Sequence, residues 1–175
     1  MSQPAEDSTD LRSGPTLHDA LLALLPLVGV WQGAGRVRVA STGEEYDYGQ
    51  RLTISHDGRP FLAHGSQTWL VDAEGNTIRQ AFRESGFWRP GAGPDDVELQ
   101  LADAAGLIEV FTGVAGTNQW ELTTTTVAGT PTARAVSAER RLYAVVGDEL
   151  AYATELAVES GQFAPHLNAR LRRQR

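Results

Sequence analysis

The clearest pattern in the chain is an alternation of apolar and polar residues, which begins after Gly29 and continues almost to the C-terminus. Successive side chains of a β-strand point to opposite faces, so a period of two predicts strands with one buried and one solvent-facing side. The clearest runs are Val97, Leu99 and Leu101; Trp120, Leu122, Thr124 and Thr126; and Tyr152, Thr154, Leu156 and Val158. We therefore predict half-buried antiparallel strands over this part of the chain.

Turn-forming sequences separate the strands at intervals typical of hairpins. They lie at residues 56–60, 73–76, 89–96, 103–106, 127–132 and 146–149, and each contains glycine, proline, aspartate or asparagine. No helix-sized segment lies between them, so the fold class is all-β, either a sandwich or a closed up-and-down barrel. The barrel is favoured because closure removes exposed strand edges.

The N-terminal part of the chain has a different pattern. Residues 1–16 are polar, acidic and interrupted by prolines, which predicts a disordered tail before a single barrel domain over residues 17–175. A short helix is expected next, capped by Thr16 and ending before Pro26. It would plug one end of the barrel with an apolar face made of Leu17, Ala20, Leu21, Leu24 and Leu25.

Glycines are dense in the stretch GVWQGAG, residues 29–35. A dinucleotide-binding G-x-G-x-x-G motif follows a strand and opens a helix, whereas here the helix comes first and strands follow. The pattern instead favours packing: Gly29 ends the helical region, Trp31 supplies a buried ring, and Gly33 and Gly35 let the first strand bend past its neighbours. The tryptophans at positions 31, 69, 88 and 120 are expected in the core and at the barrel rim.

Composition narrows the function classes. With 175 residues one domain is expected, and a net charge of -7 with a pI near 5.0 leaves no basic face for nucleic acid. The chain has no cysteine, which excludes thiolate chemistry, and its four histidines lack the spacing of a zinc or di-iron site. The apolar run at residues 17–28 is too short to span a bilayer and follows acidic residues, so we predict a cytoplasmic protein without membrane contact.

The sequence resembles a known family. G-x-W-x-G-x-G after LLPLVG is similar to the opening of lipocalin-like and fatty-acid-binding-like barrels, and more closely to that of the nitrobindins, small ten-stranded barrels that bind haem. Residues 58–69, 84–90, 131–143, 147–152 and 165–175 resemble nitrobindin segments in the same order. The resemblance covers the chain from about Leu17 to its end and implies a closed ten-stranded antiparallel barrel.

His166 is the candidate that the resemblance singles out among His18, His56, His64 and His166. It follows Pro165 at the start of the last segment, where a strand would face the barrel mouth. The nitrobindin pattern implies that its imidazole is the axial ligand of a haem b iron, one per chain. A single imidazole leaves the sixth iron position open for a small ligand.

Arg134 falls where the nitrobindin pattern has a lysine that contacts haem, so it is expected to pair with a propionate. The alternative is that it is a solvated strand residue. The chain also departs from the pattern: Phe82 replaces the usual histidine before the E-S-G element, His64 replaces a typical tyrosine, and RVRVAST replaces Y-P-T. Alternation could point His64 inward, but it is not expected to be catalytic.

The sequence alone leaves two functions from different classes open. The resemblance implies a ferric haem enzyme that isomerises peroxynitrite to nitrate, by breakage of the O–O bond and recombination of nitrogen dioxide, and that binds nitric oxide when reduced. The alternative is a haem-free carrier of a lipid-like or other apolar molecule, which the fatty-acid-binding-like opening favours. A barrel that binds nothing would leave the match around His166 unexplained, and a homodimer is expected from the resemblance only.

Overall fold

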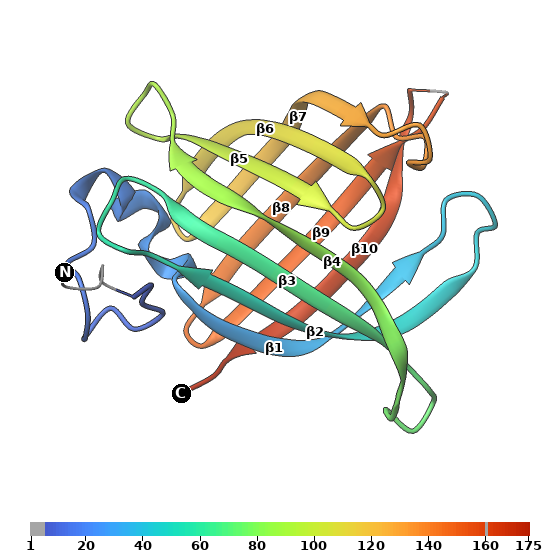
Figure 1. Cartoon of the computed structure of the whole chain (residues 1–175), viewed down its shortest axis with the longest axis horizontal. Coiled ribbons are helices and arrows are strands. Elements are labelled where there is room, and N and C mark those ends of the chain that lie inside the picture. The colour runs from blue at the N-terminus through green and yellow to red at the C-terminus, as the bar shows by residue number, and fades with distance from the viewer. Residues whose placement is uncertain (1–5, 160) are drawn as a thin grey trace.

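In the computed structural model, which describes residues 6–159 and 161–175, the chain forms a closed barrel preceded by a short 3₁₀ helix (Figure 1). The elements are η1 (Asp19–Leu27), β1 (Gly29–Arg38), β2 (Glu45–Ser55), β3 (Leu62–Val71), β4 (Thr77–Pro90), β5 (Asp96–Asp103), β6 (Leu107–Gly116), β7 (Gln119–Gly129), β8 (Ala138–Val146), β9 (Glu149–Ala157) and β10 (Phe163–Arg173). Each strand pairs antiparallel with its neighbours in sequence, and β1 pairs with β10. The predicted all-β up-and-down barrel of ten strands is confirmed.

The glycine-rich stretch lies where the barrel closes. Gly33 pairs with Leu171 and Gly35 with Ala169, and a Cβ atom on either glycine would collide with a backbone oxygen of β10. Trp31 is fully buried beside them, and its Nε1 donates a hydrogen bond of 2.8 Å to the carbonyl of Leu27. The glycines therefore allow β10 to approach β1 closely, and nothing about this stretch resembles a phosphate cradle.

Helix η1 covers one end of the barrel (Figure 1), as the sequence predicted, but its details differ. It is a 3₁₀ helix capped by His18, whose Nδ1 accepts from the amide of Ala20, so the predicted Thr16 cap is wrong. It also continues through Pro26. Its buried residues, Leu21, Leu24 and Leu27, recur every three residues, which matches the three residues per turn of a 3₁₀ helix rather than an α-helical stripe.

The described part of the predicted tail makes contacts with the barrel. Ser8 forms a β-bridge with His56, and the side chain of Ser55 donates to Asp7 at 3.1 Å. Residues 1–5 lie outside the described residues. The helices in the described part of the chain include none with the length and hydropathy needed to cross a membrane.

Two strand details differ from simple alternation. A bulge shifts the register of β7 against β6 at Thr125, so that Thr126 is exposed instead of continuing the buried row of Trp120 and Leu122. Val158 lies just after the end of β9. Trp31, Trp88 and Trp120 are fully buried, whereas Trp69 is half-buried and packs over Gly49, as expected for core and rim positions.

We predict that Gly33→Ala lowers the free energy of unfolding by about 1–3 kcal/mol, because the added methyl group overpacks the β1–β10 contact. The matched control is Gly65→Ala in β3, where a Cβ atom meets nothing within 4 Å and the change should stay below about 0.5 kcal/mol. Urea unfolding followed by tryptophan fluorescence measures both. Equal effects of the two substitutions would contradict the close approach.

Candidate functional site

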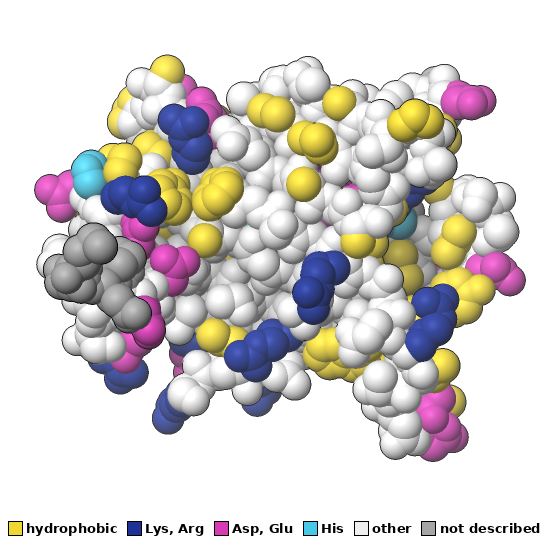
Figure 2. Space-filling model, viewed as in Figure 1, with side chains coloured by type: hydrophobic (Ala, Val, Ile, Leu, Met, Phe, Trp, Pro, Cys, Tyr) yellow, Lys and Arg dark blue, Asp and Glu magenta, His cyan; other side chains and the backbone are white. Residues whose placement is uncertain are grey.

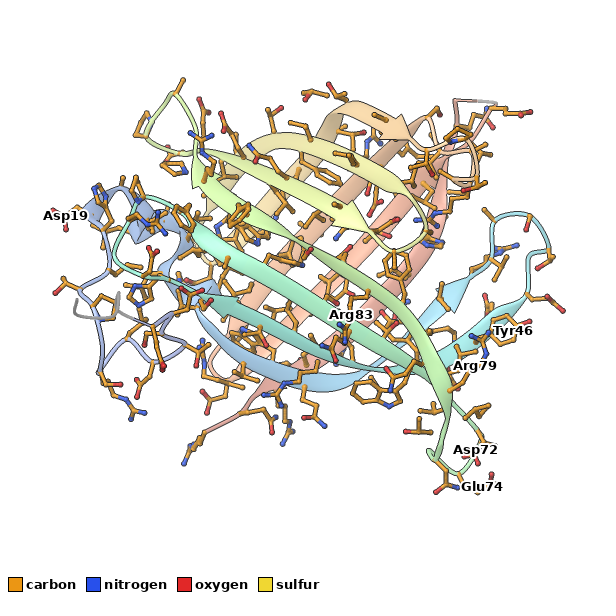
Figure 3. All side chains as sticks on the ribbon, viewed as in Figure 1. Asp19, Tyr46, Asp72, Glu74, Arg79 and Arg83 are labelled. Carbon is orange, nitrogen blue, oxygen red and sulfur yellow. The ribbon has the colours of Figure 1, made fainter. Side chains whose placement is uncertain are left out.

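The candidate site is a cavity at the end of the barrel opposite η1. It measures about 770 Å³, including the space open to solvent at its mouth, and it is lined by residues of β1 to β4, of β8 to β10 and of the β7–β8 loop. In Figure 3, Asp19 marks the end covered by η1, while Tyr46 and Arg79 lie at the opposite end, near the β1–β2 and β3–β4 hairpins. Figure 2 shows the molecule hollowed at this end, with hydrophobic side chains at the edge of the recess.

His166 lines this cavity from a β-bulge. The register between β10 and β9 shifts between Pro165 and Leu167, which makes His166 the extra residue of the strand. A bulge re-aims a side chain that regular pairing would direct elsewhere. The structure thus places His166 at the mouth, where the sequence pattern expected it.

The hydrogen bonds of His166 fix its tautomer. Nδ1 lies 2.9 Å from the carbonyl oxygen of Arg38, and Nε2 lies 3.4 Å from Nη1 of Arg134. A carbonyl only accepts and a guanidinium only donates, so Nδ1 carries the hydrogen and Nε2 presents a lone pair. Burial, outweighing the Arg38 hydrogen bond and helped by the positive charge of Arg134, lowers the pKa of His166 to about 4. The side chain is therefore a neutral imidazole at physiological pH.

Arg134 comes from the β7–β8 loop and not from a strand, and it is exposed, so the alternative of a solvated residue differs from the structure only in its strand assignment. Its side chain is 37% exposed and lines the cavity. The guanidinium lies 5.9 Å from the ring centre of Phe82 and 4.0 Å from the carboxylate of Asp103. The fold thus joins two predicted site residues that are 32 positions apart in the sequence.

Phe82 lies on β4 and also lines the cavity. Its ring is half-buried, and its backbone amide and carbonyl both contact Oγ1 of Thr68 on β3. At this position the chain therefore offers an apolar ring and no hydrogen-bond donor from the side chain.

Sequence reasoning missed a cluster of buried charges below the mouth. Arg141 of β8 reaches across the barrel to Glu84 of β4, with N–O distances of 3.0 and 2.9 Å. Its Nε lies 2.7 Å from Glu139, and its Nη2 lies 4.0 Å from Glu109. Arg141, Glu84 and Glu139 form part of the cavity wall.

These four side chains do not all carry charge. The positive charge of Arg141 and the hydrogen bonds of His64 and Arg141 outweigh burial and hold the pKa of Glu84 well below its usual range. Burial, followed by the negative charge of Glu139, raises the pKa of Glu109 to about 8. Glu109 is therefore mostly protonated at neutral pH, which relieves the repulsion between neighbouring carboxylates.

A signal for the cluster exists in the sequence. Glu109 stands between Leu107 and Phe111, and Glu139 and Arg141 alternate with Tyr143, so all occupy inward positions of predicted strands. A charge at an inward position requires a buried partner of opposite sign.

His64 is buried, as alternation allowed, but it lies away from the mouth. Its Nε2 is 3.1 Å from Glu84, and its Nδ1 accepts a hydrogen bond of 3.1 Å from Nε1 of Trp88. Both ring nitrogens are thus engaged within the protein.

The side chains that could bind a metal here suit a cofactor that itself supplies most of the ligands of its metal ion. Among the described residues no three His, Cys, Asp or Glu side chains converge to hold a bare metal ion. One neutral imidazole lines the cavity with its Nε2 lone pair towards Arg134, and a carbonyl fixes its other nitrogen, as is usual for metal-binding histidines. A haem fits this arrangement, because its macrocycle supplies the four equatorial nitrogens and the protein needs to supply only an axial ligand.

Fold and site together define a small β-barrel with a ligand cavity and one histidine poised at its mouth. The chain belongs to the nitrobindin family: the model of the THAP4-like, haem-binding β-barrel domain matches residues 20–173. The resemblance seen in the sequence is thereby confirmed.

Several relatives carry names that describe an activity. A peroxynitrite isomerase of Salinispora arenicola is 46% identical over 96% of this chain and 87% of its own length. A ferric nitrobindin-like protein of Nocardia farcinica is 42% identical over 96% of this chain and 73% of its own. The crystal structure of Rv2717c from M. tuberculosis has a TM-score of 0.79 at 33% identity, covering 91% of this chain and 99% of the other.

We predict that His166 titrates near pH 4 in the haem-free chain and stays neutral from pH 5 upwards. Because the unfolded chain binds this proton near pH 6.5, the fold loses stability as the pH falls from 6.5 towards 4. Long-range ¹H–¹⁵N NMR spectra give the pKa and the tautomer. Arg134→Gln should raise the pKa only part of the way to 6.5, because burial is the larger cause; a wild-type value near 6.5 would contradict the buried site.

We also predict that Glu84→Gln lowers the free energy of unfolding by about 3 kcal/mol, the lower end for breaking a buried ion pair because Glu139 still pairs with Arg141. The control is Glu155→Gln, which breaks the exposed pair with Arg140 and should cost less than about 1 kcal/mol. Urea unfolding measures both. The ion pair has no structural importance if the two variants lose stability equally.

Proposed function

We propose that the chain binds one haem b through Nε2 of His166 and, with the iron ferric, isomerises peroxynitrite to nitrate; in the reduced state it binds nitric oxide. The observation that carries the proposal is the neutral imidazole of His166, held by Arg38 with its lone pair towards the cavity. Membership of a haem-binding family and relatives named peroxynitrite isomerase support it.

A haem held by His166 would supply the iron chemistry that converts peroxynitrite to nitrate. The protein contributes first through His166. The hydrogen bond from Nδ1 to the Arg38 carbonyl keeps the ring oriented, prevents the other tautomer and makes Nε2 a better donor. Because the imidazole is already neutral, no proton has to leave before it can act as a ligand.

Arg134 has two roles in this proposal. Its Nη1 faces the Nε2 lone pair, so the guanidinium has to move away before that nitrogen can bind iron. Its charge is then available to a haem propionate, to which a guanidinium can donate two parallel hydrogen bonds. The same positive charge at the mouth favours entry of the peroxynitrite anion.

Phe82 contributes an apolar wall and excludes water from its part of the cavity. At this position the side chain cannot donate a hydrogen bond to a ligand. We therefore expect the reaction here to depend on the axial ligand and on access from solvent rather than on a distal histidine.

The alternative function, a carrier of lipid-like molecules, is not favoured. The deeper wall of the cavity contains Glu84, Glu139 and Arg141, and an apolar chain would have to lie against these groups. The named relatives are peroxynitrite isomerases or a nitrobindin-like protein. A cytoplasmic location, inferred from the short apolar run at residues 17–28 and the acidic residues before it, and a homodimer, inferred from the resemblance, stay proposals.

We predict that haemin added to the purified chain gives a Soret band of a haem protein that His166→Ala abolishes or shifts to that of unbound haemin. The matched control is His18→Ala, which removes an exposed histidine at the other end of the barrel and should leave the band unchanged. Stopped-flow absorbance should then show faster decay of peroxynitrite to nitrate with the loaded wild type than with His166→Ala. An unchanged band in His166→Ala would refute the assigned ligand.

A further inference from the structure

Three tryptophans are fully buried in the barrel, and their indole nitrogens have different partners. Trp31 donates to the carbonyl of Leu27 at 2.8 Å, and Trp120 donates to that of Ala23 at 2.9 Å. Trp88 instead donates to Nδ1 of His64 at 3.1 Å. A backbone carbonyl cannot take up a proton near neutral pH, whereas an imidazole nitrogen can. Trp88 therefore differs from the other two in having a base on its N–H.

The base is kept in the right state by its other neighbours. Nε2 of His64 lies 3.1 Å from Glu84, whose carboxylate also accepts two hydrogen bonds from Arg141. Arg141 and His64 hold the pKa of Glu84 below its usual range, so Glu84 is an acceptor and Nε2 of His64 carries the hydrogen. Nδ1 is then free to accept from Trp88, and a proton added there would give an imidazolium paired with Glu84.

A line of aromatic rings connects Trp88 with the cavity. Tyr152 is part of the cavity wall, and its ring stacks on that of Tyr143 with a centroid distance of 5.2 Å and an angle of 18°. Tyr143 meets Trp88 edge to face, also at 5.2 Å. Rings in direct contact pass electrons readily, so Trp88 is within reach of an oxidant in the cavity through two short steps.

The hydrogen bonds decide where an oxidised ring would be stabilised. An oxidised phenol or indole is far more acidic than the neutral ring, and at neutral pH it loses its proton when a base accepts it. The hydroxyl of Tyr152 donates to the side-chain amide oxygen of Gln50 at 2.8 Å, which is not a base. The hydroxyl oxygen of Tyr143 accepts from Arg141 at 3.2 Å, so a positive charge faces it. Only Trp88 of these three rings donates to a group that can hold the proton.

We propose that Trp88 is a redox-active residue that gives one electron, through Tyr143 and Tyr152, to a nitrogen dioxide radical in the cavity while its indole proton moves to Nδ1 of His64. Nitrogen dioxide is reduced to nitrite, Trp88 is oxidised to a neutral radical, and His64 becomes an imidazolium beside Glu84. The source of the radical rests on the proposed function, since nitrogen dioxide forms when the O–O bond of peroxynitrite breaks homolytically. The further activity is the one-electron reduction of a radical that escapes conversion to nitrate, with one radical reduced for each Trp88 oxidised.

The test generates nitrogen dioxide directly, by pulse radiolysis of nitrite solutions, in the presence of the full chain with and without bound haem. Transient absorption follows the neutral indolyl radical, and freeze-quench EPR of protein with deuterated tryptophan identifies its ring. We expect the radical in both samples. The sample without haem separates the two proposals: a chain that failed to bind haem would refute the proposed function but would still reveal the Trp88 radical.

Two variants and a control isolate the residues. Trp88→Phe should abolish the signal, whereas Trp120→Phe, which removes an equally buried indole bonded to a carbonyl, should leave it unchanged. His64→Gln can keep both hydrogen bonds with an amide but removes the base, so the rate of radical formation should fall at least about tenfold. Circular dichroism checks that each variant folds. A wild-type rate in His64→Gln, or a persisting signal in Trp88→Phe, would overturn the proposal.

Discussion

The ion pair between Arg141 and Glu84 is the interaction on which the interior of this barrel depends. It joins β8 to β4 across the core with two hydrogen bonds, and it closes the cavity from below. The same carboxylate orients His64, and through it the indole of Trp88. Charges are costly to bury, so each member of this cluster is tolerated only because the others are present. Arg141 is the shared partner, and removing it would leave the carboxyl groups of Glu84, Glu109 and Glu139 without a positive charge beside them.

The two ends of the barrel differ, because helix η1 closes one of them and the cavity opens at the other. At one end, η1 fills the opening with leucines at a spacing of three, and Trp120 ties it to the barrel through Ala23. At the other end the described residues form no helix, and a bulge in β10 directs His166 to the cavity instead of keeping it within regular pairing. Closure by η1 therefore makes the cavity accessible from one direction, where a histidine and an arginine meet.

The alternation of residues predicted the strands and favoured a closed barrel, because a strand buried on one face carries apolar residues at every second position. His166 was singled out by the resemblance to the nitrobindins and not by alternation. The sequence pattern could not predict the 3₁₀ geometry of η1, since leucines at 21, 24, 25 and 27 suit either kind of helix. The bulge at Thr125 could not be predicted either, because the presence of an extra residue in a strand depends on how that strand pairs with its neighbour. The buried positions of Arg141 and Glu109 were not predicted, because charged residues in strands are ordinarily assigned to the outer face and the partners of these two are distant in sequence.

The contact between Arg134 and His166 has a consequence for which metals the protein admits. Before any ligand enters, a permanent positive charge lies 3.4 Å from the nitrogen best suited to bind a metal. A bare divalent cation arriving there meets repulsion and only one strong donor. A haem brings carboxylates that can draw the guanidinium aside, together with an iron that already has four ligands. Under the proposed function, the arginine therefore favours a haem over a bare cation at this histidine, and the discrimination depends on charge rather than on shape.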